Sequence, residues 1–464
     1  GGCVARASTS VEMGMAPEEP SAKRARTAAA AAPWGAGSAC ATAAIAAGEV
    51  SIQASVVDAA SGAPGATEGI NTGICFLDHM IDQLTAHAQL RVSVRASLAG
   101  RPAAPRTNDF ARPELDAEIV GGAGEALGLA IKQLLSAGPA MPSREFCFCA
   151  PLDEAFTELR LEFGGQPGAE VSLAPYGIYP KTGRKYIGSY RTALTHDFFQ
   201  RLAASLGCRL SARKVRGDNA HHIVEATFKS FSRCLRKAMD AATGVSAATL
   251  APLMPERPAR VAEKKRATKE TSIDVHVNLD PKESRGAEIA TGIAALDAIF
   301  REIEAGSGIQ LRVKCSGDMY IDEHHSAEDV AITMGKAISD ALGDKGGCTR
   351  MGFAEGECGE ARVRCVLDLS NRPSFTSDLR FGARDEERIG DISIEMVCHA
   401  FESLVMSALS TVHFEQLPHG SSDPSARDLA TAAARALGAA LGECASIDPR
   451  RAGVVSSSKG TLSK

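Results

Sequence analysis

Length, composition and charge limit what this chain can be. Its 464 residues leave room for two or three domains, and 44% hydrophobic with 23% charged residues is ordinary for a globular protein. A formal net charge of −5 argues against nucleic acid as the main partner, and no apolar run approaches the length of a membrane span. Thirteen cysteines are scattered and odd in number, which indicates reduced thiols in an intracellular compartment.

Residues 1–41 form a low-complexity N-terminal tail. The stretch AKRARTAAAAAP (22–33) combines a basic cluster with an alanine run and can build no core. Three interpretations stay open for it: an organelle transit peptide, a nuclear-type signal and an idle tail. Glu12, Glu18 and Glu19 weigh against a transit peptide, because such peptides are poor in acidic residues. A cytoplasmic or plastid location is the expectation.

The first half contains strand and helix patterns and one unusual polar motif. VSIQASVVD (50–58) alternates with the period of a strand. GGAGEALG (121–128) lacks the strand and spacing of a dinucleotide-binding loop, so we interpret it as a helix start. His221, His222 and Glu225 then form an HHxxE motif, followed by apolar residues at helical spacing.

A segment rich in alanine, proline and charge separates this half from a second half that resembles it. TSIDVHVNLD (271–280) repeats the first strand pattern, and ATGIAALDAIFREI (290–303) parallels NTGICFLDHMIDQL (71–84). The chain is therefore interpreted as a tandem duplication. We expect four regions: a tail at 1–41, copy one at 42–248, a linker at 249–266 and copy two at 267–464.

The second half repeats the HHxxE motif in YIDEHHSAEDVAITMGKAI (320–338). On a helix, His324 and Glu328 share a face, and His325 points about a quarter-turn away. This suits one metal held by His324 and Glu328, with a second within reach of His325. A single motif of this kind also fits a solvated, acidic helix start. Two copies among only 11 histidines favour metal, and nitrogen with carboxylate favours manganese, iron, nickel or zinc.

These motifs, together with PLDEAF (151–156) and SSSKGTL (456–462), resemble the signature segments of imidazoleglycerol-phosphate dehydratase, an enzyme of histidine biosynthesis. The resemblance covers nearly all of residues 42–464, in two rounds. It implies an α+β fold with two tandem domains, each an internal duplication of a small sheet packed on helices. It also implies a metal-dependent lyase that removes water from imidazoleglycerol phosphate to give imidazoleacetol phosphate. The family assembles 24 such domains, so twelve fused chains would build the same large homo-oligomer.

Each copy departs from the family pattern at different positions. Copy one has ARPELDAE (111–118) where the first HHxxE belongs, and Asp197 in place of a lone histidine. Copy two has Ala298 in place of the other lone histidine, and DPSAR (423–427) in place of the second HHxxE. Together the copies supply one complete set of ligands, which the resemblance implies for two Mn²⁺ ions per chain: His79, His221, His222, Glu225, His324, His325, Glu328 and His399.

The resemblance also assigns substrate-binding and catalytic residues. The substrate phosphate is expected at Lys229, Arg350, Arg372, Ser458 and Lys459. The catalytic candidates are Glu49, Glu270, His87 and Glu154. Glu49 and Glu270 are alternatives for one acid/base, and Glu154 is either structural or close to the substrate.

Two other classes of function stay open. A catalytically silent structural or regulatory member of such an assembly would keep the metals without turnover. A different dinuclear metalloenzyme, such as a hydrolase, would explain the HHxxE motifs but not the phosphate-binding residues. The sequence does not decide whether the composite site forms within one chain or between chains.

Overall fold

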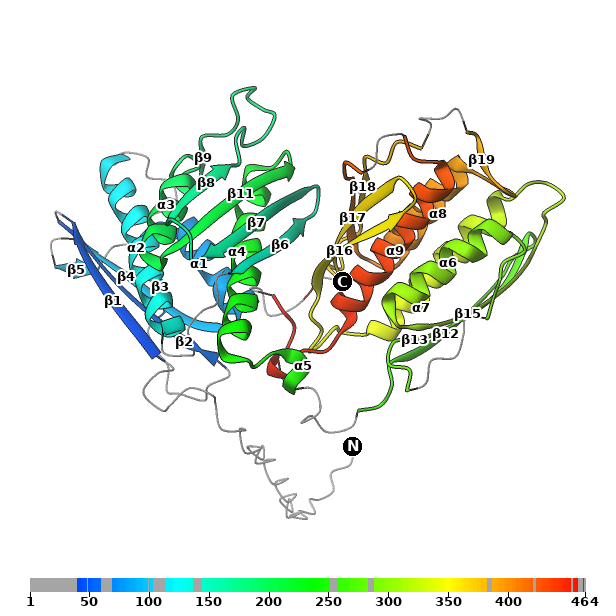
Figure 1. The fold of residues 1–464 in the computed structure, drawn as a ribbon, viewed down its shortest axis with the longest axis horizontal. Coiled ribbons are helices and arrows are strands. Elements are labelled where there is room, and N and C mark those ends of the chain that lie inside the picture. Colours follow the sequence, from blue (N-terminus) through cyan, green and yellow to red (C-terminus); the bar gives the residue numbers. More distant parts are fainter. Residues whose placement is uncertain are drawn as a thin grey trace, which may run out of the picture.

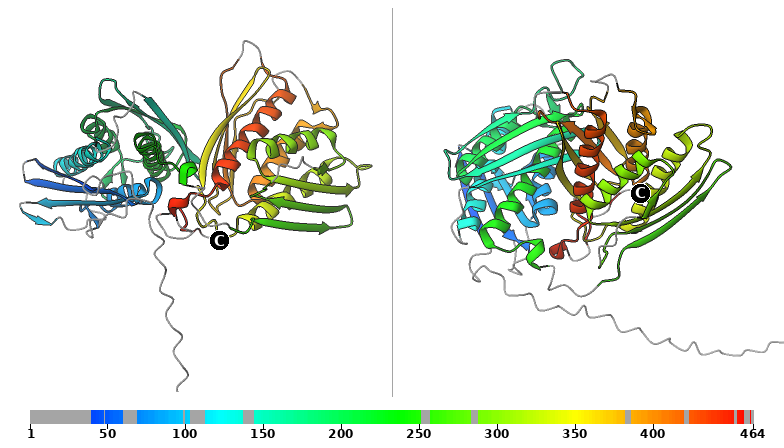
Figure 2. Two further views of the ribbon diagram at one scale, coloured as in Figure 1. Left: turned by 60° about the horizontal axis from the view of Figure 1, so that its bottom comes forward. Right: turned by 45° about the vertical axis from the view of Figure 1, so that its right-hand side comes forward.

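The computed structural model describes residues 40–47, 49–59, 69–98, 100–102, 113–136, 144–250, 257–282, 288–381, 386–419, 423–451, 454–457 and 462. Two similar halves lie side by side (Figures 1 and 2). Each half places its long helices in a layer between two mixed sheets, which confirms the α+β expectation. None of the described helices combines the length and the apolar character that a bilayer crossing requires.

The first half begins with a sheet of strand order β1-β2-β4-β3, with β5 beside β4. Its strands are β1 (Cys40–Ala47), β2 (Val50–Asp58), β3 (Ile70–Asn71), β4 (Leu90–Leu98) and β5 (Arg101–Pro102). The second sheet has the order β6-β7-β11-β8. Its strands are β6 (Arg144–Leu152), β7 (Ala155–Phe163), β8 (Gly168–Ser172) and β11 (Cys208–Arg216), with a small hairpin of β9 (Tyr186–Ile187) and β10 (Tyr190–Arg191). The helices are α1 (Cys75–Ala88), α2 (Pro113–Ser136), α3 (Leu194–Leu206), α4 (Ala220–Thr243) and α5 (Ala247–Leu250).

The second half repeats this order with sheets β12-β13-β15-β14 and β16-β17-β21-β18. The first sheet contains β12 (Val261–Ala267), β13 (Thr271–Asn278), β14 (Glu288–Ala290) and β15 (Gln310–Gly317). The second contains β16 (Met351–Cys358), β17 (Ala361–Asp368), β18 (Ser374–Ser377) and β21 (Thr411–Gln416), with a hairpin of β19 (Arg388–Ile389) and β20 (Ile392–Ser393). The helices are α6 (Ala294–Ser307), α7 (His324–Leu342), α8 (Ile394–Ser407), α9 (Ala426–Ala445) and the 3₁₀ turn η3 (Pro449–Arg451).

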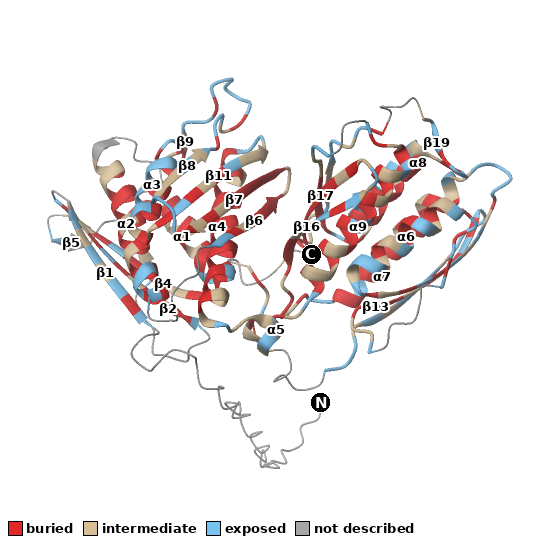
Figure 3. Cartoon of the chain, in the orientation of Figure 1, coloured by how far each residue is buried: buried red, intermediate tan, exposed pale blue. Residues whose placement is uncertain are grey.

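All four sheets share one plan. In each, the first three strands in spatial order are antiparallel, and the fourth strand pairs in parallel with the third. Buried side chains gather on the helices and on the sheet faces that cover them (Figure 3). The repeated plan fits a duplicated unit in each half. β12 begins at Val261, inside the segment expected to be the linker.

The local pattern of the glycine-rich stretch 121–128 predicts a helix start. This prediction is wrong, because the stretch lies inside α2. Its glycines let α2 approach α3 closely. A Cβ atom on Gly124 would lie 2.4 Å from the carbonyl oxygen of Phe198, and one on Gly128 would lie 2.6 Å from that of Leu202. The space is filled by a neighbouring backbone, so the glycines serve helix packing.

The two halves contact each other through their second sheets, where β6 packs against β16, β17 and β21. Apolar contacts join them, with the rings of Phe148 and Phe353 5.6 Å apart. A buried ionic cluster crosses the same boundary, because Arg364 of β17 donates to Glu158 of β7 at 2.7 Å. This boundary matters for function because a cavity is lined from both sides of it.

Candidate metal centre and substrate cavity

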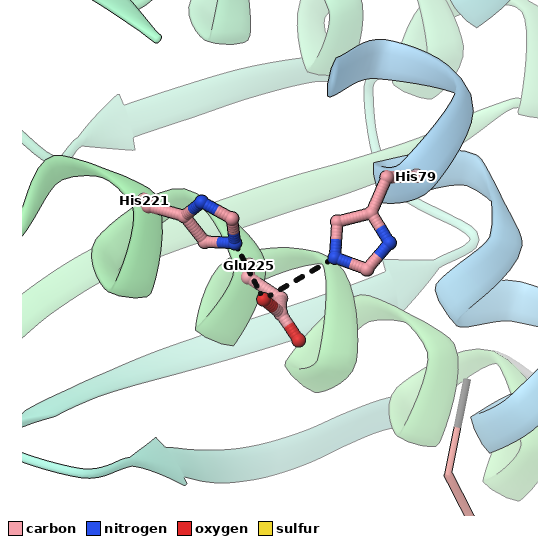
Figure 4. A group of neighbouring side chains, drawn as sticks. All are labelled: His79, His221 and Glu225. Atoms are coloured by element: carbon pink, nitrogen blue, oxygen red, sulfur yellow. Dashed lines mark hydrogen bonds and ion pairs between the residues drawn. The ribbon is translucent and has the colours of Figure 1, made fainter. Parts of the chain in front are cut away.

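Three side chains of the first half converge at the start of α4 (Figure 4). The side chain of Asn219 caps this helix by accepting a 2.9 Å hydrogen bond from the backbone amide of His221. One helical turn separates His221 from Glu225, so their Nε2 and Oε2 atoms lie 3.0 Å apart. His79 approaches from α1, with its Nε2 atom 3.5 Å from the same oxygen. We call His79, His221 and Glu225 the copy-one triad.

The second half contains the same arrangement built from α7 and α8. Asp322 accepts a 2.9 Å hydrogen bond from the backbone amide of His324, the first residue of α7. Glu328 lies one turn later, and its carboxylate is 3.7 Å from His324 Nε2 and 3.1 Å from His399 Nε2. We call His324, Glu328 and His399 the copy-two triad.

Both triads fit a divalent cation. In each, one nitrogen or oxygen atom per residue lies within 4.8 Å of the other two. Ligands about 2.0–2.2 Å from a common ion lie roughly 3.0–3.5 Å from each other, which is close to the His–Glu spacings given above. Imidazole and carboxylate donors without a thiolate suit a transition metal such as manganese or zinc.

The second histidine of each motif is oriented by a carboxylate. His222 Nδ1 lies 2.7 Å from Glu154 Oε2, and His325 Nδ1 lies 3.1 Å from Asp318 Oδ2. In both cases the carboxylate engages Nδ1, which leaves Nε2 as the candidate ligand atom. Glu154 also accepts a 2.9 Å bond from the amide of Asn219.

A cavity of about 400 Å³ lies beside the copy-one triad and is lined from both halves. The first half contributes His222, His87 and Lys229 besides the triad, and the second half contributes Arg350 and Arg372. Candidate ligands of a cation and candidate partners of an anion therefore line one space. Neither α7 nor α8 contributes a described residue to this lining, so the copy-two triad lies outside the cavity of its own chain.

Two cations of the lining are buried and already paired. Lys229 is 4% exposed, and its Nζ lies 2.9 Å from Oε1 of Glu225, so Oε2 stays directed at the histidines. Burial lowers the pKa of Lys229, and the charge of Glu225 partly opposes this. Arg350 is 5% exposed and donates to both oxygens of Asp368, at 2.7 and 2.9 Å, and to the carbonyl of Ser456.

Arg372 is more accessible, and its Nε atom lies 2.9 Å from Asp153 of the other half. Beside Asp153, Glu154 is ionised: burial would raise its pKa, but the hydrogen bond and charge of His222 prevail and lower it to about 2. A carboxylate with such a pKa is a weak base. The contact therefore indicates that Glu154 positions His222.

His87 is fully buried at the end of the cavity. Its Nδ1 lies 3.4 Å from Ser456 Oγ, and its Nε2 is buried with no hydrogen-bond partner in the described structure. Burial lowers the pKa of His87 well below its ordinary value, and the charges of Lys229 and Arg233 add to this effect. His87 is therefore a neutral imidazole.

The other predicted residues lie outside this cavity or outside the described residues. Glu270 is exposed, and its Oε1 lies 4.0 Å from His325 Nε2. Glu49 is exposed in the turn between β1 and β2 and is not part of the lining. Ser458 and Lys459 lie outside the described residues, although their neighbour Ser457 lines the cavity.

Arg184 also lines the cavity, and the sequence motifs do not predict it. It lies in the loop between β8 and β9, and a lone arginine in a loop carries no motif. The nearest signal is the cluster of Lys181, Arg184 and Lys185 in the sequence itself. All described cysteines are unpaired, which agrees with the expectation of reduced thiols.

Comparison with known proteins gives the same assignment in both halves. The family model described as imidazoleglycerol-phosphate dehydratase matches residues 72–235 and again 291–441. Imidazoleglycerol-phosphate dehydratase 3, chloroplastic, of Triticum aestivum is 38% identical over 233 residues, covering 50% of this chain and 83% of the wheat protein. Imidazoleglycerol-phosphate dehydratase of Magnetococcus marinus is 40% identical over 205 residues, covering 44% of this chain and 99% of the bacterial protein.

Among solved structures, an imidazoleglycerol-phosphate dehydratase of Pyrococcus furiosus in complex with a ligand aligns with 27% sequence identity and a TM-score of 0.35. That alignment covers 43% of this chain and all of the archaeal one. The assignment rests on the two sequence matches, which together span more than half of the chain. The chain belongs to the imidazoleglycerol-phosphate dehydratase family.

Proposed function

We propose that this chain is an active, metal-dependent imidazoleglycerol-phosphate dehydratase with one composite active site per chain. The observation that carries the proposal is the cavity in which the copy-one triad faces Arg350 and Arg372 of the other half. The reaction would remove water from imidazoleglycerol phosphate and give imidazoleacetol phosphate. The complementary loss of ligands that we infer from the family resemblance is the second support.

The residues have separable roles in this proposal. The copy-one and copy-two triads, with His222 and His325, would hold two divalent ions, most suitably Mn²⁺, that supply Lewis acidity at the substrate imidazole. Glu154 fixes the ring of His222, and Lys229 holds the second oxygen of Glu225. These contacts keep the ligand atoms in position before substrate arrives.

Anion binding falls to the cations of the cavity. Arg372 and Arg350 from the second half, with Lys229, would hold the substrate phosphate, and Ser458 and Lys459 remain the further phosphate-binding residues of this proposal. His87, neutral and with a free buried nitrogen, would accept or donate one hydrogen bond to the bound substrate. The substrate would thus span the boundary between the halves, in reach of the copy-one triad and of Arg350 and Arg372.

Removal of the carbon-bound proton needs a base. Glu270 and Glu49 remain the two candidates, and the contact of Glu270 with His325 supports Glu270. A carboxylate beside a ligand of the second ion would lie close to the reacting carbon atoms. Glu49 would take this role only where β1 and β2 of another chain approach the site.

We further propose that the site is completed between chains. The copy-two triad lies outside the cavity of its own chain, so a second chain would present His324, His325, Glu328 and His399 to it. Such an arrangement requires a homo-oligomer, for which twelve chains would reproduce the 24 domains of the family. Copy one at 42–248, the linker at 249–266 and copy two at 267–464 remain our proposed boundaries, and a plastid or cytoplasmic location remains a prediction.

The test uses full-length protein with Mn²⁺ and imidazoleglycerol phosphate. His79→Ala and His324→Ala variants should each be inactive alone. When the two are co-assembled in equal amounts, random pairing restores roughly a quarter of the sites if each site draws its triads from two chains. No recovery, with active wild type, would place both triads of a site in one chain.

The alternative is a catalytically silent structural or regulatory member of an assembly. The partly exposed copy-two triad is the observation that supports it, since a metal ion bound there could join chains without chemistry. Wild-type protein that binds Mn²⁺ and assembles but gives no product at saturating substrate would establish this alternative. A different hydrolytic activity would need a separate explanation for the arginines of the cavity.

A further inference from the structure

One of the described cations of the cavity lining differs from the others in having no described carboxylate within ion-pairing distance. Arg184 is exposed, and no described acidic residue lies within ion-pairing distance of its guanidinium group. It borders the main cavity and two smaller neighbouring ones. The side chain therefore stands where these three spaces meet, in the lining that it shares with the copy-one triad.

The backbone that carries Arg184 is held in place on both sides. Its amide donates to the carbonyl of Tyr176 at 2.5 Å, and its carbonyl accepts from Thr192 Oγ1 at 2.9 Å. Gly183 has a φ of +81°, and a Cβ atom there would lie 2.6 Å from the amide nitrogen of Tyr176. A turn that only glycine tolerates thus precedes the arginine.

Further contacts tie the same loop to the body of the first half. Lys214 Nζ donates to the carbonyl of Pro175. Tyr176 packs against the core cluster of Leu173 and Ile223, and its side chain bonds to Thr195. The loop therefore holds the start of the Arg184 side chain in a fixed place, which lowers the entropy that a ligand would have to remove.

The charge distribution distinguishes Arg184 from the expected phosphate-binding residues. Lys229 is paired with Glu225, Arg350 with Asp368, and Arg372 lies against Asp153. Each of these cations is largely neutralised before a ligand arrives. Arg184 alone among the described cations of the lining has no acidic group within ion-pairing distance, although Glu154 and Asp218 line a neighbouring cavity with it. A guanidinium group without such a partner favours a phosphate or another oxyanion.

We infer that Arg184 is a further substrate-binding residue, which contacts the phosphate of the bound substrate from the lining of the cavity. This inference rests on the proposed function for the identity of the substrate. Neither HHxxE motif nor the phosphate residues carried over from the family include this position. The chemical class recognised is a phosphate monoester, whose dianion complements the open guanidinium group.

The experiment compares Arg184→Ala and Arg184→Lys with Lys181→Ala. Lys181 is the matched control, because it is exposed on the same loop and lines none of the three cavities. Its replacement by alanine removes the same charge as Arg184→Ala. Steady-state turnover gives KM and kcat, and calorimetric titration with inorganic phosphate gives a Kd that does not depend on catalysis. All variants are full-length chains, and the exposed side chains make misfolding a minor concern.

Loss of one charge-assisted bond at an exposed position should raise KM about tenfold, with kcat changed less than about twofold. The phosphate Kd should rise by a similar factor, and lysine should restore part of the affinity. Arg184→Ala values within about twofold of those for Lys181→Ala would overturn the inference. A shift in KM without a shift in phosphate Kd would overturn the assignment to phosphate.

The two proposals can fail separately. If wild-type protein shows no turnover, the proposed dehydratase function fails, and the phosphate titration still decides whether Arg184 binds an oxyanion. If wild type turns over and Arg184→Ala matches the control in both measurements, only the role of Arg184 is lost.

Discussion

Replacing Glu158 by alanine should loosen the boundary between the two halves and destabilise the chain by about 3 kcal/mol at neutral pH. Glu158 is 7% exposed on β7. It accepts a 2.7 Å bond from Arg160 and a 3.0 Å bond from Arg213 in its own half. Its bond of 2.7 Å from Arg364 crosses to the second half. The cavity is lined from both halves, so this contact bears on the site as well as on stability.

The magnitude follows from burial and from what remains after the change. Removing one partner of a buried ion pair costs about 3–5 kcal/mol, because the other charge is left uncompensated. Arg364 keeps Glu355 at 2.8 Å and Glu415 at 3.1 Å, which places the loss at the low end of that range. The pKa of Glu158 gives the same magnitude independently. Burial would raise this pKa, but the hydrogen bond from Arg160 and the charge of Arg364 prevail and lower it to about 2.

The same pKa fixes how stability depends on pH. The folded pKa of Glu158 lies near 2 and the ordinary value is 4.5, so the folded state favours the ionised form by about 3 kcal/mol. This stabilisation is complete above the ordinary value and is lost as the pH falls from 4.5 toward 2. The difference in unfolding free energy between wild type and Glu158→Ala should therefore be about 2 kcal/mol smaller at pH 3 than at pH 7.

Equilibrium unfolding in urea, followed by circular dichroism, measures this difference. Glu145→Ala is the matched control, because Glu145 pairs with the same Arg160 at 2.7 Å but both side chains are more than 40% exposed. That exposed pair should contribute less than about 1 kcal/mol. A loss below about 1 kcal/mol for Glu158→Ala, or a difference that grows toward pH 3, would refute the argument from burial.

Three further predictions concern the composite site. Metal analysis of reconstituted wild type should give two divalent ions per 464-residue chain, and close to four or none would contradict the single complete ligand set. Copy one and copy two expressed separately should be inactive, and mixing them should restore some activity if they assemble; robust turnover by copy one alone would exclude the composite site. Arg372→Ala should weaken substrate binding by about 1.5–3 kcal/mol, measured as a rise in KM. Gln166→Ala, at the position of copy one that we match to Arg372, should leave KM unchanged within about twofold. Equal effects of the two substitutions would argue against different roles for the two copies.

Much of the fold and of the two candidate metal-binding triads can be predicted from sequence because both depend on local spacing. A helix brings residues four apart onto one face, so the spacing alone predicts that His221 pairs with Glu225 and His324 with Glu328. The period of two residues in the strands and the repetition of whole segments indicate a doubled α+β architecture. The family resemblance supplies what spacing does not, including the lone histidines.

The local patterns fail where backbones from distant segments approach each other. GGAGEALG (121–128) has the local pattern of a helix start, but α3 packs against it and its glycines serve that contact inside α2. Arg184 belongs to no sequence motif. Its proposed role in substrate binding follows from the loop that holds it and from the ion pairs of every other described cation in the cavity. Neither fact is contained in the residues next to it.

The sequence by itself determined which chemical groups this protein has, and it is the basis of the prediction that each half keeps a different part of one ligand set. Only the tertiary structure decided which of them meet. His79 joins His221 and Glu225 because α1 and α4 pack together, and Arg350 and Arg372 reach the same cavity because the two second sheets face each other. The copy-two triad stays outside that cavity. Side chains hundreds of residues apart become neighbours only through the burial of helix and sheet surfaces, and that long-range packing is not encoded in any short stretch of sequence.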